Sequence, residues 1–349
     1  MSDRVISKDK IQDFIKALMG KYTVVAPMDR GNAPAEFREL SAGDEPILDG
    51  SKMTMTPKEY LLPRYETLFK ANTKKGEISV ETTVPETQPR VMMGMWLPDA
   101  QAIHVLDVVF LDKKFKDPYY AARRESTAII ATVPAEPRWS WFCSSLDDVE
   151  SWKKNVDAVM YDLGDSYYVE VVNDNASTTF DGSFFSDPSD ADIAKKNEVW
   201  AKFKGNELPF ASKALYDNLV WDDEIWAEIA QKCIACGICS YNCPSCSCFD
   251  IQDETKGNCV ERYRCRDACQ FKDFTLMGHG HNPRPNQLPR SRQRLLHKFR
   301  YQHKQFGVVG CTGCGRCVEL CPVNIDIRDI LARTCAKERV ESGEQKAEG

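Results

Sequence analysis

Cysteine spacing is the feature of this sequence that most directly predicts chemistry. Fourteen of the fifteen cysteines lie between Cys233 and Cys335, and eight of them form two copies of the pattern Cys-x2-Cys-x2-Cys-x3-Cys-Pro, beginning at Cys233 and Cys311. In a reducing compartment, such a dense and regular set of thiols is typical of metal binding rather than of disulfides. Zinc sites usually combine two Cys-x2-Cys pairs or mix cysteine with histidine, whereas this pattern is typical of paired [4Fe–4S] clusters. The sequence therefore predicts two such clusters.

The cysteine before each proline is expected to cross over to the other cluster. Three thiolates at this spacing can hold three corners of an iron–sulfur cube, while the fourth is directed away by the turn that precedes the proline. Gly237, Gly313 and Gly315 allow the backbone to pack close to a cluster, where its N–H groups can point at sulfur. The predicted ligand sets are Cys233, Cys236, Cys239 and Cys321 for the first cluster, and Cys311, Cys314, Cys317 and Cys243 for the second.

A second, less regular group of cysteines leaves two interpretations open. The group consists of Cys246, Cys248, Cys259, Cys265 and Cys269. We prefer Cys246, Cys248 and Cys269 as ligands of a third cluster, whose fourth ligand is either Cys265 or His281. The alternative is that these thiols are small buried side chains beside the two predicted clusters. A Cys-x-Cys pair next to a cluster motif is an uncommon way to fill a core, so the third cluster is kept as a hypothesis.

The segment between the two motifs is strongly basic. Residues 274–318 contain no acidic residue, and Arg and Lys recur from Arg284 to Lys304. A positive field of this kind would stabilise the reduced, more anionic form of a cluster and could dock an acidic partner. The alternative is an ordinary solvated helix face. His279 is interpreted as a loop residue, and Cys143 and Cys335 as buried packing residues rather than ligands.

Composition and charge exclude several classes of protein. The chain has 349 residues, 42% of them hydrophobic and 28% charged, which suits a globular protein of two domains. Its formal net charge of −6 does not fit a general nucleic-acid binder. We find no apolar run long enough to cross a membrane, no signal peptide and no twin-arginine motif, so a cytoplasmic location is expected. Walker, GxGxxG and nucleophile-elbow motifs are also absent.

The remaining patterns predict a mixed fold of the α+β class. Apolar runs predict strands at 22–27, 91–97 and 128–133, with a helix from 98 to 110 completing a βαβ unit, and a hairpin formed by 158–163 and 167–172. Residues 1–20 are expected to form a surface helix and residues 174–192 a loop or linker. Helix-like segments at 221–232 and 291–306 lead into the two cysteine motifs.

These patterns predict three regions along the chain. We expect a mixed α/β partner-docking domain over residues 1–215, an α-helical ferredoxin-type dicluster domain over residues 216–338, and a polar tail over residues 339–349. The wide separation of the two cysteine motifs, and the helical segments before them, favour the helical rather than the minimal bacterial type of ferredoxin.

Over nearly its whole length the sequence resembles the family that contains the dicluster iron–sulfur subunit of anaerobic sulfite reductase and the iron–sulfur beta subunit of cytoplasmic sulfhydrogenases, which are group 3 nickel–iron hydrogenases. Short segments carry the resemblance in both halves of the chain. In the C-terminal half they are 233–249, Cys269, 280–282, 297–298 and 311–317; in the N-terminal half they are 98–100, 117–120, 142–144 and 162–165. The family also marks Cys246, Cys248 and Cys269 as shared positions, but not clearly Cys265.

The resemblance implies an electron relay without a substrate site of its own. The implied partners are a flavin-containing, NAD(P)H-oxidising subunit and a catalytic subunit, either a siroheme sulfite reductase or a nickel–iron hydrogenase. Family members commonly have cysteines where this chain has Leu97 and Trp141, which implies that an extra N-terminal metal site is missing. Two other functions are considered: a self-contained reductase of sulfur compounds acting at an incompletely ligated third cluster, and a structural zinc scaffold.

Overall fold

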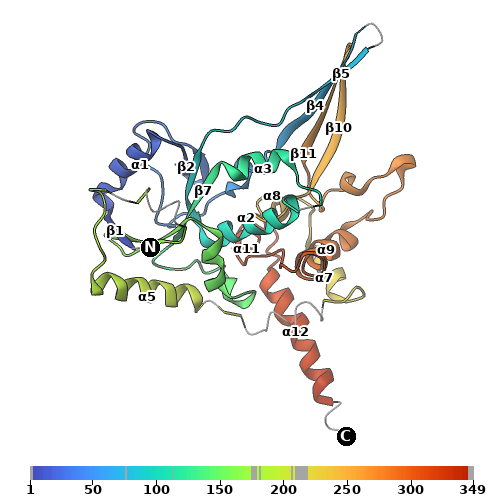
Figure 1. Cartoon of the computed structure of the whole chain (residues 1–349). Helices are drawn as coiled ribbons and strands as arrows, with labels where there is room; N and C mark the ends of the chain where they lie inside the picture. Colours follow the sequence, from blue (N-terminus) through green and yellow to red (C-terminus); the bar gives the residue numbers. More distant parts are fainter. Residues whose placement is uncertain are drawn as a thin grey trace.

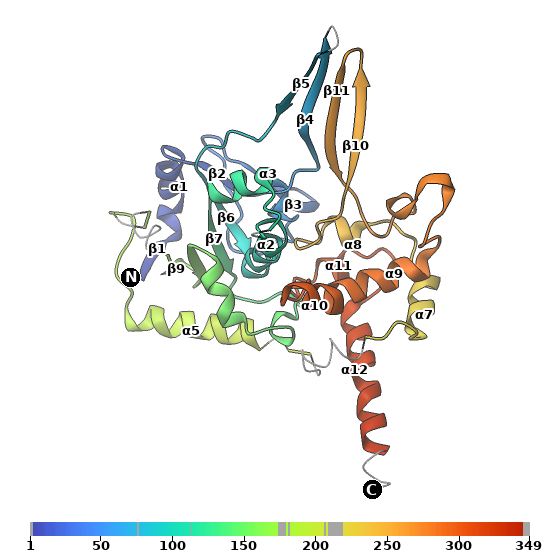
Figure 2. The ribbon, with the colours of Figure 1, turned by 45° about the vertical axis from the view of Figure 1, so that its right-hand side comes forward.

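The computed structural model describes residues 3–74, 77–112, 114–173, 179–180, 182–205, 207–208 and 219–344. It contains two β-sheets and a layer of helices, in agreement with the predicted α+β class. Both ribbon views show a body that carries a projecting sheet at one end and helix α12 (Ile327–Glu344) at the other (Figures 1 and 2). No helix in the described part of the chain is both long enough and apolar enough to span a membrane.

A seven-stranded sheet forms the centre of the N-terminal region. Its order is β1-β9-β8-β7-β6-β2-β3, and the strands are Arg4–Ser7 (β1), Thr23–Arg30 (β2), Ala33–Glu39 (β3), Arg90–Trp96 (β6), Thr127–Val133 (β7), Ala158–Asp162 (β8) and Ser166–Val171 (β9). Neighbours among β2, β6, β7 and β8 pair in parallel, and the outer strands are antiparallel. The predicted βαβ unit and the hairpin after residue 158 are therefore confirmed.

Helices cover both faces of this sheet because its central strands are apolar on both sides. On one face, α1 (Ile11–Met19) buries Ile11 and Phe14. On the other, α2 (Leu97–Phe110) and α5 (Asp190–Lys204) contribute side chains such as Ile103 and Trp200 to a second core. A further short helix, α3 (Pro118–Glu125), starts at the N-cap Asp117.

Two local predictions in this region need correction. Residues 1–20 are not one helix, because Arg4–Ser7 pairs with β9 as an edge strand and the helix begins only at Ile11. The predicted loop 174–192 ends sooner, because a capping box between Ser189 and Asp192 starts α5 at Asp190. Residues 174–178 and 181 of that loop lie outside the described residues.

The cysteine-rich region is mainly helical, as predicted. Its helices are α7 (Ile225–Lys232), α8 (Ile238–Tyr241), α9 (Gln287–Leu296), a π-helical turn (His297–Tyr301), α10 (Gln302–Phe306), α11 (Arg316–Glu319) and α12. Their shared core also includes Phe142 and Leu146 from the N-terminal region. The predicted tail is helical as far as Glu344, and its last residues lie outside the described part of the chain.

A four-stranded arm is the element that the sequence did not predict. Its order is β10-β11-β4-β5, and the strands are Tyr65–Lys74 (β4), Glu77–Thr82 (β5), Phe249–Lys256 (β10) and Cys259–Arg266 (β11). The two hairpins come from opposite halves of the chain, and β11 pairs with β4 along its whole length. Figure 2 shows them side by side, projecting away from the helices.

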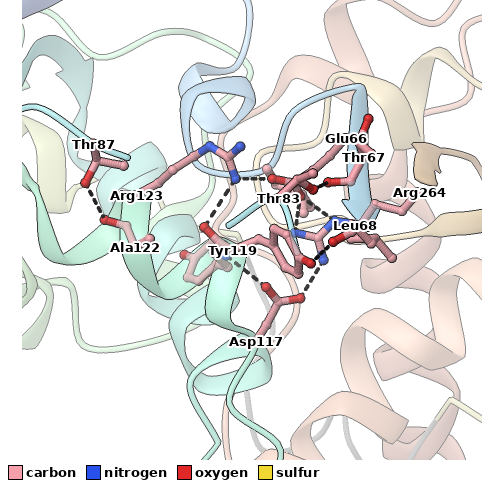
Figure 3. A network of polar contacts seen from close by, with 12 residues as sticks. Glu66, Thr67, Leu68, Thr83, Thr87, Asp117, Tyr119, Ala122, Arg123 and Arg264 are labelled. Carbon is pink, nitrogen blue, oxygen red and sulfur yellow. Dashed lines mark hydrogen bonds and ion pairs between the residues drawn. The ribbon is translucent and has the colours of Figure 1, made fainter. Parts of the chain in front are cut away.

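A buried ion-pair network fixes the base of the arm. Arg264 on β11 contacts Glu66 on β4 at 2.7 Å and Asp117 at the start of α3 at 2.5 Å, and Arg123 of α3 also contacts Glu66 (Figure 3). The Arg264 and Glu66 side chains are each only 4% exposed, so neither charge is screened by water.

We expect Arg264→Met to reduce the free energy of unfolding by about 3 kcal/mol, because it leaves buried carboxylates without one of their cationic partners. The matched control is Arg262→Met on the same strand: its ion pair with Asp253 is 43% and 45% exposed, so water screens it and its loss should change the stability far less. Chemical denaturation followed by circular dichroism compares the two variants. Equal losses would show that burial of the pair is not what anchors the arm.

Candidate iron–sulfur centres

The two cysteine motifs fold in the same way. Each contains a short helix, α8 or α11, whose N-cap is a left-handed glycine, with φ of 75° at Gly237 and 73° at Gly315. A side chain at either position would also collide with its surroundings, because a Cβ would lie 2.5 Å from the Phe271 ring in one case and 2.1 Å from the Ser140 hydroxyl in the other. The glycines are therefore needed both for the turn and for close packing.

The four predicted ligands of the first cluster face one cavity. Cys233, Cys236 and Cys239 of the first motif line it together with Cys321 of the second. Cys317 also reaches this cavity, so it lies on the side between the two predicted centres. The other walls are largely apolar and come from α7, α9 and α12. Cys236 is exposed, which places this centre next to solvent.

The predicted ligands of the second cluster lie deeper. Burial raises the pKa of the Cys311 thiol to about 12, and the nearby sulfurs of Cys317 and Cys243 act on it in the same direction. Burial also raises the pKa of Cys314 to about 11, with Cys243 again among its neighbours. These mutual effects mean that the four sulfurs share one region. Binding iron requires all of them as thiolates, so loading the site releases protons.

The third group of cysteines is only partly brought together. Cys246, Cys248 and Cys269 line one small cavity, whose walls also include His297 and Lys298. Within the part of the chain that the structure describes, no three His, Cys, Asp or Glu side chains are spaced to hold a single metal ion.

Neither predicted fourth ligand of a third cluster reaches this cavity. Cys265 lies on β11 between Arg264 and Arg266, which are both buried. Because side chains alternate along a strand, the Cys265 side chain is on the other face of β11, and it does not line this cavity. His281 is exposed in the loop after residue 278 and is not among the lining residues. His297 is the histidine that the cavity offers instead, at its solvent-facing mouth.

Buried cations surround the motifs, and the sequence did not indicate which basic residues point at the cysteines. Lys58, which is 1% exposed, comes from the N-terminal region and donates to the carbonyl oxygens of Cys243 at 2.7 Å and Cys246 at 2.9 Å. Arg294 donates to the carbonyl of Cys239 at 3.2 Å, and Lys298 is 4% exposed. The basic segment is thus not simply a solvated helix face, since some of its charges point inward at the cysteines.

A buried ion pair joins the second motif to the central sheet. Arg316, between Cys314 and Cys317, contacts Asp99 in the first turn of α2, at the carboxyl end of β6, and both side chains are at most 1% exposed. Burial raises the pKa of Asp99, while the Arg316 guanidinium opposes that shift. The Arg316 guanidinium also stacks 4.5 Å from the Trp96 ring and donates to Thr54. The dicluster region therefore docks at the carboxyl edge of the parallel strands, the usual cofactor side of such sheets.

Comparison with known proteins agrees with this geometry. The family described as a 4Fe–4S dicluster domain matches residues 232–325. Over 326 residues, the chain is 30% identical to the sulfhydrogenase 2 subunit beta of Pyrococcus furiosus, covering 91% of this chain and 94% of that protein. The chain belongs to this family of sulfhydrogenase beta subunits. No solved structure matches it.

Membership of the family confirms the main cofactors, since a dicluster domain binds two [4Fe–4S] clusters. Apolar residues, Leu97 and Trp141, occupy the two positions where members of the family commonly have cysteines. Leu97 and Trp141 are both almost completely buried in the core beside the sheet, and the Trp141 ring packs 5.2 Å from that of Trp96.

Cys143 and Cys335 are both buried, as expected of packing residues. Cys143 lies against the second motif, where its thiol is 3.5 Å from the carbonyl oxygen of Gly313. Its location could not be read from the sequence, because 170 positions separate the two residues.

We expect Asp99→Asn to destabilise the protein by about 3 kcal/mol, because it leaves the Arg316 cation buried without its anion. Iron should also be lost faster to a chelator, since Arg316 holds the loop between two predicted ligands. Asp329→Asn is the matched control: its ion pair with Arg333 is long, at 3.6 Å, and 64% exposed at the aspartate. Thermal unfolding and the rate of iron release measure both effects. Identical behaviour of the two variants would contradict a structural role for the buried pair.

Proposed function

We propose that this chain is the iron–sulfur relay subunit of a cytoplasmic oxidoreductase complex. It passes single electrons between a flavin-containing, NAD(P)H-oxidising subunit and a catalytic subunit of the nickel–iron hydrogenase or sulfite reductase type. The observation that supports the proposal is one cavity lined by cysteines of both motifs, with Cys236 exposed at the first motif and Cys314 buried at the second. The relative's name, a beta subunit of a sulfhydrogenase, supports an assembly with other subunits.

The crossed ligand sets are part of this proposal. The first cluster is held by Cys233, Cys236, Cys239 and Cys321, and the second by Cys311, Cys314, Cys317 and Cys243. Support for the first set is the single cavity that its four cysteines line. Support for the second set is the electrostatic effect of Cys243 on both Cys311 and Cys314. When bound, each cluster accepts and returns one electron.

Electron exchange with a partner is proposed to occur at the first centre. Cys236 is exposed, and the neighbouring Ile234 is 60% exposed, which gives an apolar contact point directly over a ligand. Residues 1–215 are proposed as the partner-docking region, residues 216–338 as the dicluster region and residues 339–349 as a polar tail. The four-stranded arm is proposed as a further surface for binding other subunits. Its strands come from the N-terminal region and from the dicluster region.

A third [4Fe–4S] cluster at Cys246, Cys248 and Cys269 is proposed, with His297 as the fourth ligand. The support is that one cavity is lined by all four side chains, whereas Cys265 and His281 lie elsewhere. Histidine nitrogen is a known replacement for cysteine at iron–sulfur centres.

The relay role predicts a stable complex. A tagged chain purified anaerobically from its native cells should bring down a flavoprotein and a redox-active catalytic subunit, identified by mass spectrometry and by flavin and nickel or siroheme content. A Cys236→Ser/Cys239→Ser variant should still assemble but transfer electrons from the reduced flavoprotein at a rate at least about tenfold lower. Recovery of the native chain without any redox partner would rule out the proposal.

The crossed ligation predicts which variants resemble each other. Cys321→Ser should alter the same EPR signal of the reduced protein as Cys233→Ser, whereas Cys243→Ser should alter the signal affected by Cys311→Ser. The reason is that members of a pair hold the same cluster, although they belong to different motifs. The opposite pairing would show that each motif binds its own cluster with all four of its cysteines.

The third cluster predicts about twelve irons per chain rather than about eight. His297→Ala should lower the count towards eight or convert the centre to a three-iron form, while His281→Ala and Cys265→Ser should leave the count unchanged. Colorimetric iron assay and EPR of anaerobically prepared protein provide the measurement. Eight irons in the unmodified chain would remove the third cluster, without affecting the assignment of the other two.

A further inference from the structure

Lys298 is a buried ammonium group that contacts the sulfur of a predicted cluster ligand. It lies in the π-helical turn between α9 and α10 and is 4% exposed. Its Nζ donates to Cys243 Sγ at 3.0 Å, to Ser245 Oγ at 3.2 Å and to the carbonyl oxygen of Gly310 at 2.7 Å. The three N–H groups of the ammonium are thus all used, and one of them is directed at a thiolate.

The positive charge of Lys298 has no carboxylate to neutralise it. Among the described residues, no Asp or Glu side chain forms an ion pair with this lysine, although surface lysines of the chain commonly have one. A charge buried this deeply requires an anion close by. The Cys243 sulfur, 3.0 Å from the ammonium nitrogen, is therefore the group that supplies this negative charge.

Among the described residues, the other cations near the motifs contact backbone carbonyls or, in the case of Arg316 at the Cys314 sulfur, are already paired with a carboxylate. Lys58 donates to the backbone carbonyls of Cys243 and Cys246, and burial lowers its pKa to about 8. Arg294 reaches the first motif through the carbonyl of Cys239. Arg316 is neutralised by Asp99. In the described part of the chain, the direct contact between a lysine and a sulfur is thus made at Cys243, which we propose as a ligand of the second cluster.

The packing around Lys298 holds the ammonium at this point. The N–H group of Gly310, immediately before the second motif, donates to the Lys298 carbonyl at 2.7 Å. A Cβ at position 310 would lie 3.1 Å from the Lys298 Cα and would collide with the Gln302 side chain, so the two segments touch at their backbones. The backbone of Lys298 is consequently fixed against the start of the second motif.

We propose that Lys298 is the positioning residue that raises the reduction potential of the cluster bound through Cys243, making it the more easily reduced of the two dicluster centres. The proposal rests on the proposed function, in which Cys243 is a ligand. Reduction adds one electron from an external donor and turns the dianionic centre into a trianion, with no proton taken up and no bond broken. A fixed cation and an N–H···S hydrogen bond stabilise the trianion more than the dianion.

The experiment is a potentiometric titration of the anaerobic holoprotein, with dithionite as reductant and EPR as the readout. Lys298→Met should shift the midpoint potential of one cluster to a lower value and leave the other nearly unchanged. Lys298→Arg, which keeps the charge, should recover most of the loss. Lys304→Met is the matched control, because Lys304 lies on the adjoining helix α10 with the same charge but is exposed. It should shift neither potential, since water and salt screen its charge.

A second measurement on the unmodified protein covers the case in which Lys298→Met does not assemble its clusters. Pulsed EPR of the reduced protein in H2O and D2O should detect an exchangeable proton strongly coupled to one cluster, as expected of the ammonium N–H on Cys243. An unchanged potential in a fully loaded Lys298→Met variant, or the absence of that proton, would overturn the proposal. Absence of clusters from the unmodified protein would instead overturn the proposed function.

Discussion

The electrostatic cost of burying negative charge is the constraint on which this structure depends. Two clusters with four thiolates each are anionic, and of the second set of candidate ligands Cys314 is buried and the other three are half-buried. Lys58, Lys298 and Arg316 are each at most 4% exposed, and they come from the N-terminal region, the segment between the two motifs and the second motif itself to meet at these cysteines. Without these cations the same cysteines would favour the protonated, iron-free state.

The three buried cations are neutralised in different ways, and this gives each a different role. Arg316 is paired with Asp99, so its main effect is mechanical: it fixes the second motif to the carboxyl edge of the sheet. Lys58 and Lys298 have no carboxylate partner among the described residues, so their charge acts on the cysteines. Lys58 contacts the backbone of the turn, whereas Lys298 contacts a ligand sulfur.

The N-terminal region and the dicluster region are physically one unit in several respects. Phe142 and Leu146 complete the apolar core of the helical layer, and Phe142 N donates to the carbonyl oxygen of Gly313 at 3.0 Å. The arm joins the two regions a second time through the pairing of β11 with β4. The cysteine motifs are therefore built against the N-terminal region at both places.

The sequence alone determined the features that depend on local spacing. Three cysteines with two residues between each pair, and glycine at the turn, predict a loop that wraps a cluster, and both motifs fold alike, with a left-handed glycine before a short helix. The apolar runs of the central strands and the turn at residues 163–165 likewise specified the parallel unit and the hairpin, because each signal lies within a few residues of the structure it encodes.

Tertiary structure alone decided the features that depend on contacts between distant segments. The hairpin β10–β11 has strands rich in charged residues, which resemble a surface loop in sequence, and its pairing with β4 gives it a place in a sheet. The inward direction of Lys298, the burial of Lys58 and the partnership of Asp99 with Arg316 also have no local signal. A charged residue is expected at the surface on average, and only the packing of the whole chain around a cysteine-rich centre makes its burial favourable.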